Sequence, residues 1–360
     1  MYNVKLKCQV ITPLFMSGAD GDDLKVRPSE FKGMMRFWWR AARALDDIHK
    51  LKEEENEIFG GVGKGEGKSK VWIRVFEEDI SRQNELRLAS SKPGIEYLLY
   101  STILPNKKKK YIKENSTFYI ELSSFEERYF NHALASLWLA IYLGGFGTRS
   151  RRGGGNIVVT EVNKPLFIDF IPTKGENFQE VAEWLTTNFR KAQRVINGFD
   201  KTNFASRYSN LSASRFIISK RGHLSWEEAL NDIGNIFRDF RKEHEKQVFD
   251  SAVFGLPVRH RSGESVAGAK KAGQKVLERF QRRASPVIIK LIKANGLHYW
   301  LVIRLAGQFL PEGAVLTFKD KIQKPDYGLI EEFWSQLRKK GEERVLSVPG
   351  YLNEIVDKIK

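Results

Sequence analysis

Cysteine is almost absent from this sequence of 360 residues, which contains only Cys8. A single cysteine excludes an internal disulfide and any cysteine-based zinc site. Long apolar runs are also missing, because the longest strongly apolar stretch, residues 133–143, is about half the length that spans a bilayer. The first residues alternate between polar and apolar types instead of forming the apolar segment of a signal peptide. We therefore expect a cytoplasmic protein with no membrane partner.

Acidic residues are too few to balance the basic ones. The sequence has 60 Lys and Arg against 44 Asp and Glu, a formal net charge of +16. This excess favours a polyanionic partner such as a nucleic acid.

Catalytic patterns are lacking as well, since the six histidines are scattered and no HExxH, GxSxG or paired metal-ligand spacing occurs. The sequence thus predicts no catalytic residue, no metal and no cofactor, although His260, among arginines, stays open as a general base for RNA cleavage.

The first part of the chain predicts an α+β domain. Period-two alternation and β-branched or aromatic residues predict strands, and apolar residues at three- and four-residue spacing predict helices. The predicted strands cover residues 2–10, 70–76, 116–124 and 157–162, and the predicted helices cover residues 29–45 and 127–143. The resulting order of strand, helix, strand, strand, helix, strand is the ferredoxin-like, RRM-like arrangement βαββαβ.

The second part predicts the same class with insertions. The predicted strands cover residues 166–170, 286–293 and 297–305, and the predicted helices cover residues 177–196, 225–247 and 328–340. Ile58-Phe59-Gly60 is echoed by Val253-Phe254-Gly255, each ahead of a basic loop and a strand, which favours two copies of one fold. We predict two packed ferredoxin-like domains, residues 1–164 and 165–360, divided in a segment that contains two prolines and a charge-rich end.

Residues 144–155, GGFGTRSRRGGG, are the most unusual stretch of the sequence. Nucleotide-binding glycine loops run from a strand into a helix, whereas this loop runs from a predicted helix into a predicted strand. Gly67-Lys68-Ser69 resembles the end of a Walker A loop, but Val62 stands where the first glycine is required and no strand precedes it. A linker does not need packed arginines. Glycine allows close backbone approach and guanidinium groups bind phosphates, so these residues favour an RNA clamp. The predicted contacts are Gly145, Gly147, Arg149, Arg151, Arg152, Gly153 and Gly154.

The first predicted helix carries a second basic element. Lys32, Arg36, Arg40 and Arg43 follow one another at spacings of four, four and three residues, which places them in one stripe beside the apolar face. No acidic residue lies on this stripe. A solvated helix face usually mixes charges of both signs, so an unmixed stripe also favours a polyanion.

A third basic element lies in the second part, over residues 259–283. Its candidate RNA-binding residues are Arg259, Arg261, Arg282 and Arg283. Small residues are frequent between Gly263 and Gly273, which predicts a mobile segment that becomes ordered on a partner.

Several motifs together resemble the RAMP superfamily, and within it the family of subunit one of the Cmr module, the type III-B CRISPR effector. They are ITPLFMSGAD, RPSEFKGMMRFWWRA, IFGG and the glycine-rich loop in the first part, and FGLP and RRASPV in the second. The resemblance implies two ferredoxin-like domains and a non-catalytic role in RNA-guided antiviral defence. It also implies guide RNA, target RNA and other Cmr subunits as partners, with a position near the 3′ end of the guide.

Two other functions remain open at this stage. RAMP relatives include metal-independent endoribonucleases that process CRISPR RNA, but in those relatives the glycine loop lies near the end of the chain, and here residues 156–360 follow it. A basic scaffold for anionic partners in general predicts no preference for RNA. We therefore expect a non-catalytic RNA-binding subunit, with the endoribonuclease as the alternative.

Overall fold

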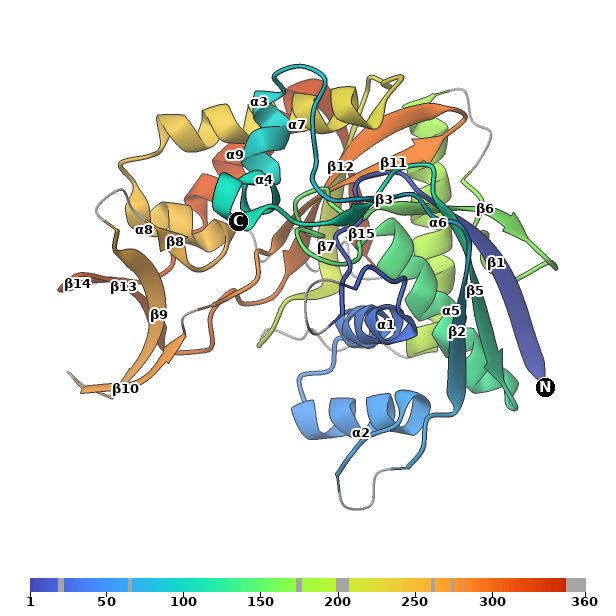
Figure 1. Ribbon diagram of the computed structural model, residues 1–360. Helices are drawn as coiled ribbons and strands as arrows, with labels where there is room; N and C mark the ends of the chain where they lie inside the picture. The colour runs from blue at the N-terminus through green and yellow to red at the C-terminus, as the bar shows by residue number, and fades with distance from the viewer. Residues whose placement is uncertain are drawn as a thin grey trace.

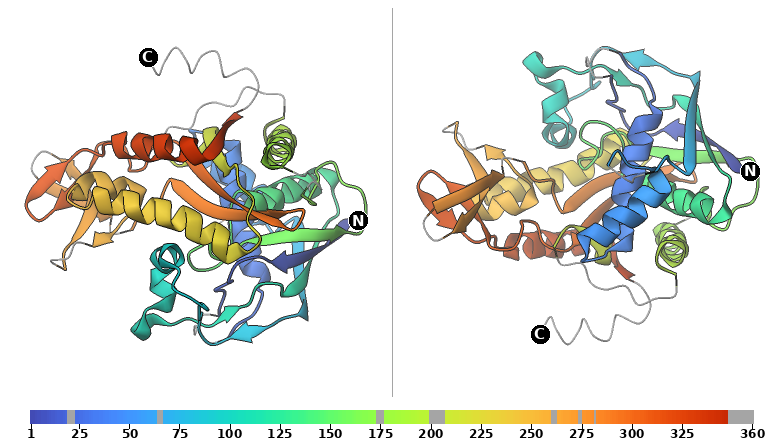
Figure 2. Two further views of the ribbon diagram at one scale, coloured as in Figure 1. Left: turned by 90° about the horizontal axis from the view of Figure 1, so that it is seen from above. Right: turned by 90° about the horizontal axis from the view of Figure 1, so that it is seen from below.

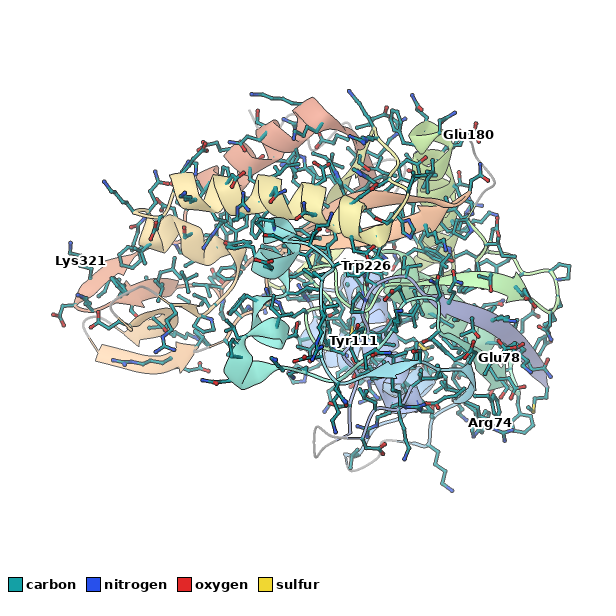
Figure 3. The ribbon with its side chains drawn as sticks, turned by 45° about the horizontal axis from the view of Figure 1, so that its top comes forward. Arg74, Glu78, Tyr111, Glu180, Trp226 and Lys321 are labelled. Carbon is teal, nitrogen blue, oxygen red and sulfur yellow. The ribbon has the colours of Figure 1, made fainter. Side chains whose placement is uncertain are left out.

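The computed structural model describes residues 1–18, 23–63, 67–172, 177–198, 207–259, 263–272, 275–280 and 282–347. It is a mixed α+β structure whose main sheets are antiparallel. Two four-stranded sheets form its body, and a third sheet lies at the end opposite to the N-terminus (Figures 1 and 2). In Figure 3, Lys321 marks the third sheet, and Arg74 and Glu78 mark the first sheet at the other end.

The first sheet has the strand order β2-β5-β1-β6. Its elements follow in the chain as β1 (Tyr2–Val10), α1 (Pro28–Arg43), α2 (Ile48–Phe59), β2 (Val71–Asp79), β5 (Thr117–Ser124), α5 (Glu127–Tyr142) and β6 (Ile157–Val162). Between β2 and β5 the chain forms β3 (Arg82–Gln83), α3 (Pro93–Leu98), α4 (Tyr100–Ile103), the 3-10 turn η1 (Pro105–Lys107) and β4 (Tyr111–Ile112). Apart from α2 and these short elements, the connection is the β-α-β-β-α-β order expected from the sequence. Each predicted strand and helix of this part is found, with ends shifted by a few residues.

Apolar alternation explains how this sheet is packed. Leu6 of β1 and Phe118 of β5 point to the face that α1 and α5 cover, where the rings of Phe31 and Phe118 lie 5.8 Å apart. Helix α5 is buried over almost its whole length, as its apolar sequence predicts. No helix in the part of the chain that the structure describes is long and apolar enough to cross a membrane.

The second sheet has the strand order β11-β12-β7-β15. Its elements are β7 (Asn210–Ser219), α7 (Trp226–Glu243), β11 (Val287–Ala294), β12 (Leu297–Ala306), α9 (Gly328–Lys340) and β15 (Gly341–Ser347), preceded by α6 (Phe178–Asn197). These strands again connect in β-α-β-β-α-β order. The sequence predicted β11, β12 and the three helices but missed β7 and β15, because polar residues such as Asn210, Ser212 and Ser214 interrupt the apolar alternation of β7.

The third sheet is an insertion. It has the order β10-β9-β13-β14, with β8 paired to β9. Its elements, with the short helices before it, are α8 (Val248–Ser251), η2 (Ala252–Phe254), β8 (Val258–Arg259), β9 (Ser265–Ala272), β10 (Lys275–Phe280), β13 (Ala314–Phe318) and β14 (Lys321–Gln323). The basic segment 259–283, predicted to be mobile, therefore contains two paired strands, β9 and β10.

The predicted strand over residues 166–170 is wrong. This segment has no strand pairing, although Ile168 and Phe170 are buried in the core. Side chains satisfy its backbone instead: Trp138 Nε1 donates to the Asp169 carbonyl at 2.9 Å, and the Asp169 amide donates to Asn188 Oδ1 at 2.9 Å. Burial produced the apolar pattern, and side-chain hydrogen bonds replace the strand partner that the pattern predicted.

The two main sheets meet where β6 lies beside β11. The Leu291 amide donates to Asn156 Oδ1 at 2.6 Å, and the buried Lys290 Nζ donates to the Ile141 carbonyl of α5 at 2.5 Å. Val159 of β6 and Ile288 of β11 belong to one continuous apolar cluster. The two parts of the chain are therefore joined by a buried core, and the glycine-rich loop lies at its edge.

Candidate nucleic-acid interface

The basic stripe of α1 is partly neutralised by the next helix. Arg36 Nε lies 2.5 Å from Glu55 Oε1, Arg40 pairs with the same oxygen, and Arg43 Nε lies 2.7 Å from Glu54 Oε2. The Glu55 side chain is 4% exposed. The stripe carries no acidic residue of its own, as the sequence indicated, but these three arginines are paired because α2 folds back and supplies carboxylates that do not lie on α1.

Lys32, at the start of the stripe, differs from the three arginines. It is half-buried, and no carboxylate in the described part of the chain pairs with it. Burial, with a smaller contribution from the charge of Arg36, lowers the pKa of Lys32 below its ordinary value. Lys32 therefore keeps an uncompensated positive charge beside the arginines.

The glycines of residues 144–155 allow the loop to fold tightly against the protein itself. Gly147 has a φ of +73° and Gly155 a φ of +63°, in the left-handed region. A Cβ atom at Gly155 would lie 1.9 Å from the Phe146 carbonyl oxygen, and one at Gly147 would lie 2.4 Å from that of Phe15. Gly145, Gly153 and Gly154 are buried, so the contact with RNA that the sequence predicted for them finds no exposed surface.

The arginines of this loop bind backbone carbonyl oxygens. Arg149 Nε donates to Leu98 at 2.7 Å, Arg151 donates to Ser285, and Arg152 donates to Val287 at 2.9 Å and to Phe254 at 2.8 Å. A guanidinium also lies over an aromatic ring in each case, over Tyr100, Phe37 and Phe237 respectively, at 4.8, 5.0 and 5.1 Å from the ring centre. The sequence did not reveal these hydrogen bonds, because every acceptor is distant in the chain from its arginine.

These guanidinium groups remain charged, and no carboxylate in the described part of the chain pairs with them. Burial, and then the charge of Arg283, lowers the pKa of Arg151 to about 10. Burial, and then neighbouring arginines, lowers the pKa of Arg152 to about 9. Both groups are still protonated near pH 7. Hydrogen bonds to neutral carbonyls engage some of their donors but do not cancel the charge, so the region attracts anions.

A cavity of about 500 Å³ opens beside this loop, and we call it the arginine pocket. It is lined by Phe37, Arg40, Ile48, Leu51, Arg151, Arg207, Tyr208, Ser209, Arg283, Ala284 and Pro311. The described lining residues include four arginines and no carboxylate. Guanidinium groups bind phosphate oxygens through paired N–H donors, and the rings of Phe37 and Tyr208 offer surfaces on which a base can stack.

The arginine pocket brings together part of the predicted site. Arg40, Arg151 and Arg283 come from the three predicted basic elements, which are the first helix, the glycine-rich loop and the segment 259–283. Arg149 and Arg152 turn into the protein, Arg282 is exposed nearby in the chain, and Arg259 lines a different cavity. Arg261 and His260 lie outside the described residues. Sequence patterns did not indicate Phe37, Arg207 or Tyr208 as site residues. The signal available for the last two was that an arginine and a tyrosine, Arg207 and Tyr208, are adjacent in the chain.

Two observations concern catalytic and metal chemistry. The described residues contain no group of three His, Cys, Asp or Glu side chains placed to hold a metal ion. His132 on α5 accepts a hydrogen bond from Trp39 Nε1 at Nδ1, at 3.0 Å, and burial lowers its pKa to about 4. His132 is therefore neutral near pH 7.

Comparison with known proteins places the chain in a family. The model of the RAMP superfamily matches residues 7–158. The chain is 36% identical over 189 residues to the CRISPR system Cmr subunit Cmr1-2 of Pyrococcus furiosus, a match that covers 46% of this chain and 100% of that protein. It is 26% identical over 299 residues to Cmr1-1 of the same organism, covering 80% and 82% of the two chains. The chain therefore belongs to the RAMP superfamily, among the RAMP proteins of the Cmr module.

Solved structures show the same fold over nearly the whole chain. The crystal structure of apo Cmr1 from Pyrococcus furiosus matches with a TM-score of 0.66 at 21% identity, covering 97% of this chain and 99% of that one. A chain in the cryo-EM structure of the type III-B Cmr-beta bound to cognate target RNA matches with a TM-score of 0.54 at 16% identity, covering 94% and 99%.

Proposed function

We propose that this protein is an RNA-binding, non-catalytic subunit of a type III-B Cmr ribonucleoprotein, equivalent to subunit one. In this role it binds guide RNA, or guide RNA paired with target RNA, near the 3′ end of the guide and contributes to target capture. Relatives named as Cmr1 support the subunit, and a similar fold in a complex named as bound to target RNA supports the ligand. We take the two β-α-β-β-α-β units to be two ferredoxin-like domains, divided near residues 164 and 165.

The arginine pocket is the observation that carries this proposal. Arg40, Arg151, Arg207 and Arg283 approach one cavity from separate parts of the chain, and none of its described lining residues is acidic. Assembling like charges is unfavourable unless an anion or water screens them. A sugar-phosphate backbone supplies that anion, and contacts of this kind position RNA without reading its sequence. Base pairing within the RNA then supplies the specificity.

Charge reversal at the exposed Arg207 tests this function. Arg207 is exposed and no hydrogen bond or ion pair involves it in the described part of the chain, so we expect Arg207→Glu to fold normally. We expect it to weaken binding of single-stranded RNA about tenfold for all sequences and to reduce the slope of log affinity against log salt by about one. Arg190→Glu, on the exposed side of α6, is the matched control. Equal RNA affinity of the two variants would remove the arginine pocket from the proposal.

A nuclease assay separates this function from the endoribonuclease alternative. We expect the purified protein to bind guide-precursor RNA without cutting it in the presence of a chelator. Defined cleavage products that disappear in His260→Ala would instead establish the endoribonuclease.

A further inference from the structure

A second cavity, of about 340 Å³, is lined by residues of α3, α7, α8 and β8. Figure 1 shows where these elements lie in the fold. We call it the α7 pocket. It shares no lining residue with the arginine pocket. Basic side chains line it from two elements, and a single carboxylate, that of Glu245, is among its described lining residues. The basic residues are Arg238, Arg241, Lys242 and Arg259.

Arg241 is a fixed positive charge in the wall of this cavity. Its Nη1 donates to the Ser251 carbonyl at 2.6 Å, and its guanidinium lies 5.3 Å from the centre of the Phe254 ring. These contacts hold the side chain in place, and no carboxylate in the described part of the chain pairs with it. Burial lowers the pKa of Arg241, and a hydrogen bond with the Tyr97 side chain acts in the opposite direction.

Lys242 and Arg259 supply charge that is free to move toward a ligand. Both are exposed, and no carboxylate in the described part of the chain pairs with either. Lys242 follows Arg241 on α7, whereas Arg259 approaches from β8. An anion bound in the cavity would therefore be reached by cations from both elements.

An aromatic ring completes the site. Tyr97 of α3 is half-buried and lines the cavity, and its ring packs against Phe237 at 5.9 Å in an edge-to-face arrangement. The volume is at the lower end of the range for small-molecule sites. An acidic peptide would satisfy the charges but would not use the ring, whereas a nucleotide offers a phosphate and a stacking base together.

We propose that the α7 pocket is a second binding site, for a single nucleotide unit, with the phosphate on Lys242 and Arg259 and the base against Tyr97. The nucleotide belongs to a single-stranded part of an RNA chain or is free. This site does not depend on RNA binding in the arginine pocket. The two sites would hold the RNA at separate points on the protein.

The test uses the full chain with Arg207→Glu, so that the arginine pocket is already impaired. Short single-stranded RNA with 4-thiouridine is crosslinked to this chain and to the same chain carrying Lys242→Glu and Arg259→Glu. Lys191→Glu with Lys339→Glu, two exposed lysines on α6 and α9, is the matched control. We expect a crosslink to the peptide that contains Tyr97, and about tenfold weaker RNA binding only when Lys242 and Arg259 are changed.

Competition distinguishes the source of the nucleotide. If free uridine monophosphate removes the Tyr97 crosslink, the pocket accepts a free nucleotide; if it does not and RNA alone crosslinks, the pocket requires a nucleotide within a chain. The proposal is overturned if the changes at Lys242 and Arg259 leave both the crosslink and the affinity unaltered, or if an acidic peptide competes and RNA does not. Thermal unfolding of both double variants verifies folding, and Lys242→Gln with Arg259→Gln replaces the charge reversal if it unfolds.

Discussion

Arg151 and Arg152 are neighbours in the chain, and both donate to backbone carbonyls just before or at the start of β11, Arg151 to Ser285 and Arg152 to Val287. In addition, the Ile289 amide donates to the Arg151 carbonyl at 3.1 Å. The glycine-rich loop thus fastens the first part of the protein to the second. One of the two arginines, Arg151, also lines the arginine pocket, so the same loop joins the two parts of the chain and contributes to the proposed RNA site.

Arg152→Met tests the fastening role of the loop. The change leaves the carbonyls of Val287 and Phe254 without their donor, and an unsatisfied buried acceptor is costly. We expect the free energy of unfolding to fall by about 2–4 kcal/mol in urea denaturation. Arg282→Met, at an exposed position, is the control and should change stability by less than about 0.5 kcal/mol. A similar small change in both variants would show that Arg152 does not hold the joint together.

Gly155→Ala tests why the loop is rich in glycine. Gly155 has a left-handed backbone, and its added Cβ would lie 1.9 Å from the Phe146 carbonyl oxygen, a contact that only backbone movement can relieve. We expect a loss of more than about 2 kcal/mol or failure to fold. Gly33→Ala on α1 is the matched control. Nothing lies within 4 Å of its added Cβ, so this change should stabilise the protein by roughly 0.5–1 kcal/mol. Thermal unfolding of both variants measures the difference, and equal effects would contradict this account.

Glu55→Gln separates stability from RNA affinity. Glu55 is buried and pairs with both Arg36 and Arg40, so its neutralisation should lower the free energy of unfolding by about 1–3 kcal/mol, less than for a fully buried pair because the arginines are partly exposed. It also removes the negative charge next to Arg40 of the arginine pocket. RNA affinity in low salt should therefore rise by about threefold. Glu53→Gln, exposed on the same helix, should change neither quantity, and weaker RNA binding in Glu55→Gln would argue against the pocket.

Lys290 makes the stability of the protein depend on pH. Burial lowers the pKa of its amine to about 7 in the folded state, whereas in the unfolded chain it has its ordinary value. Between these two values the unfolded chain binds the additional proton, so the free energy of unfolding should rise with pH, by about 2 kcal/mol from pH 7 to pH 9. Denaturation of Lys290→Met should lack this rise, and Lys191→Met should retain it. Parallel curves for the wild type and Lys290→Met would show that Lys290 stays protonated.

The first sheet could be predicted from the sequence because local patterns and packing agree there. Strand β1 alternates polar and apolar residues along its whole length, and α5 is apolar almost throughout, so each element indicates its own burial. Strand β7 carries buried serines and an asparagine whose partners are not visible in the sequence. The segment around Ile168 and Phe170 has the composition of a strand, but side chains of α5 and α6 take the place of a neighbouring strand.

In the candidate site, too, contacts between distant parts of the chain could not be predicted from the sequence. Residue types alone indicated that Arg40, Arg151 and Arg283 belong to basic elements, and the fold brings them to one cavity. The sequence did not show that Glu54 and Glu55 neutralise the α1 stripe or that Arg149 and Arg152 turn toward carbonyls. A basic motif has the same composition whether its charges face a ligand or the protein, and only tertiary contacts decide between them.

Crosslinking of RNA in the intact ribonucleoprotein tests the central claim most directly. The protein would be purified with its own RNA and partner subunits after growth with 4-thiouridine, irradiated and mapped by mass spectrometry. We predict crosslinks to the peptides that contain Phe37 and Tyr208, with loss of both in Arg207→Glu. Crosslinks confined to the outer face of the first sheet, at the exposed Trp72 and Phe76, would contradict the arginine pocket as the RNA site.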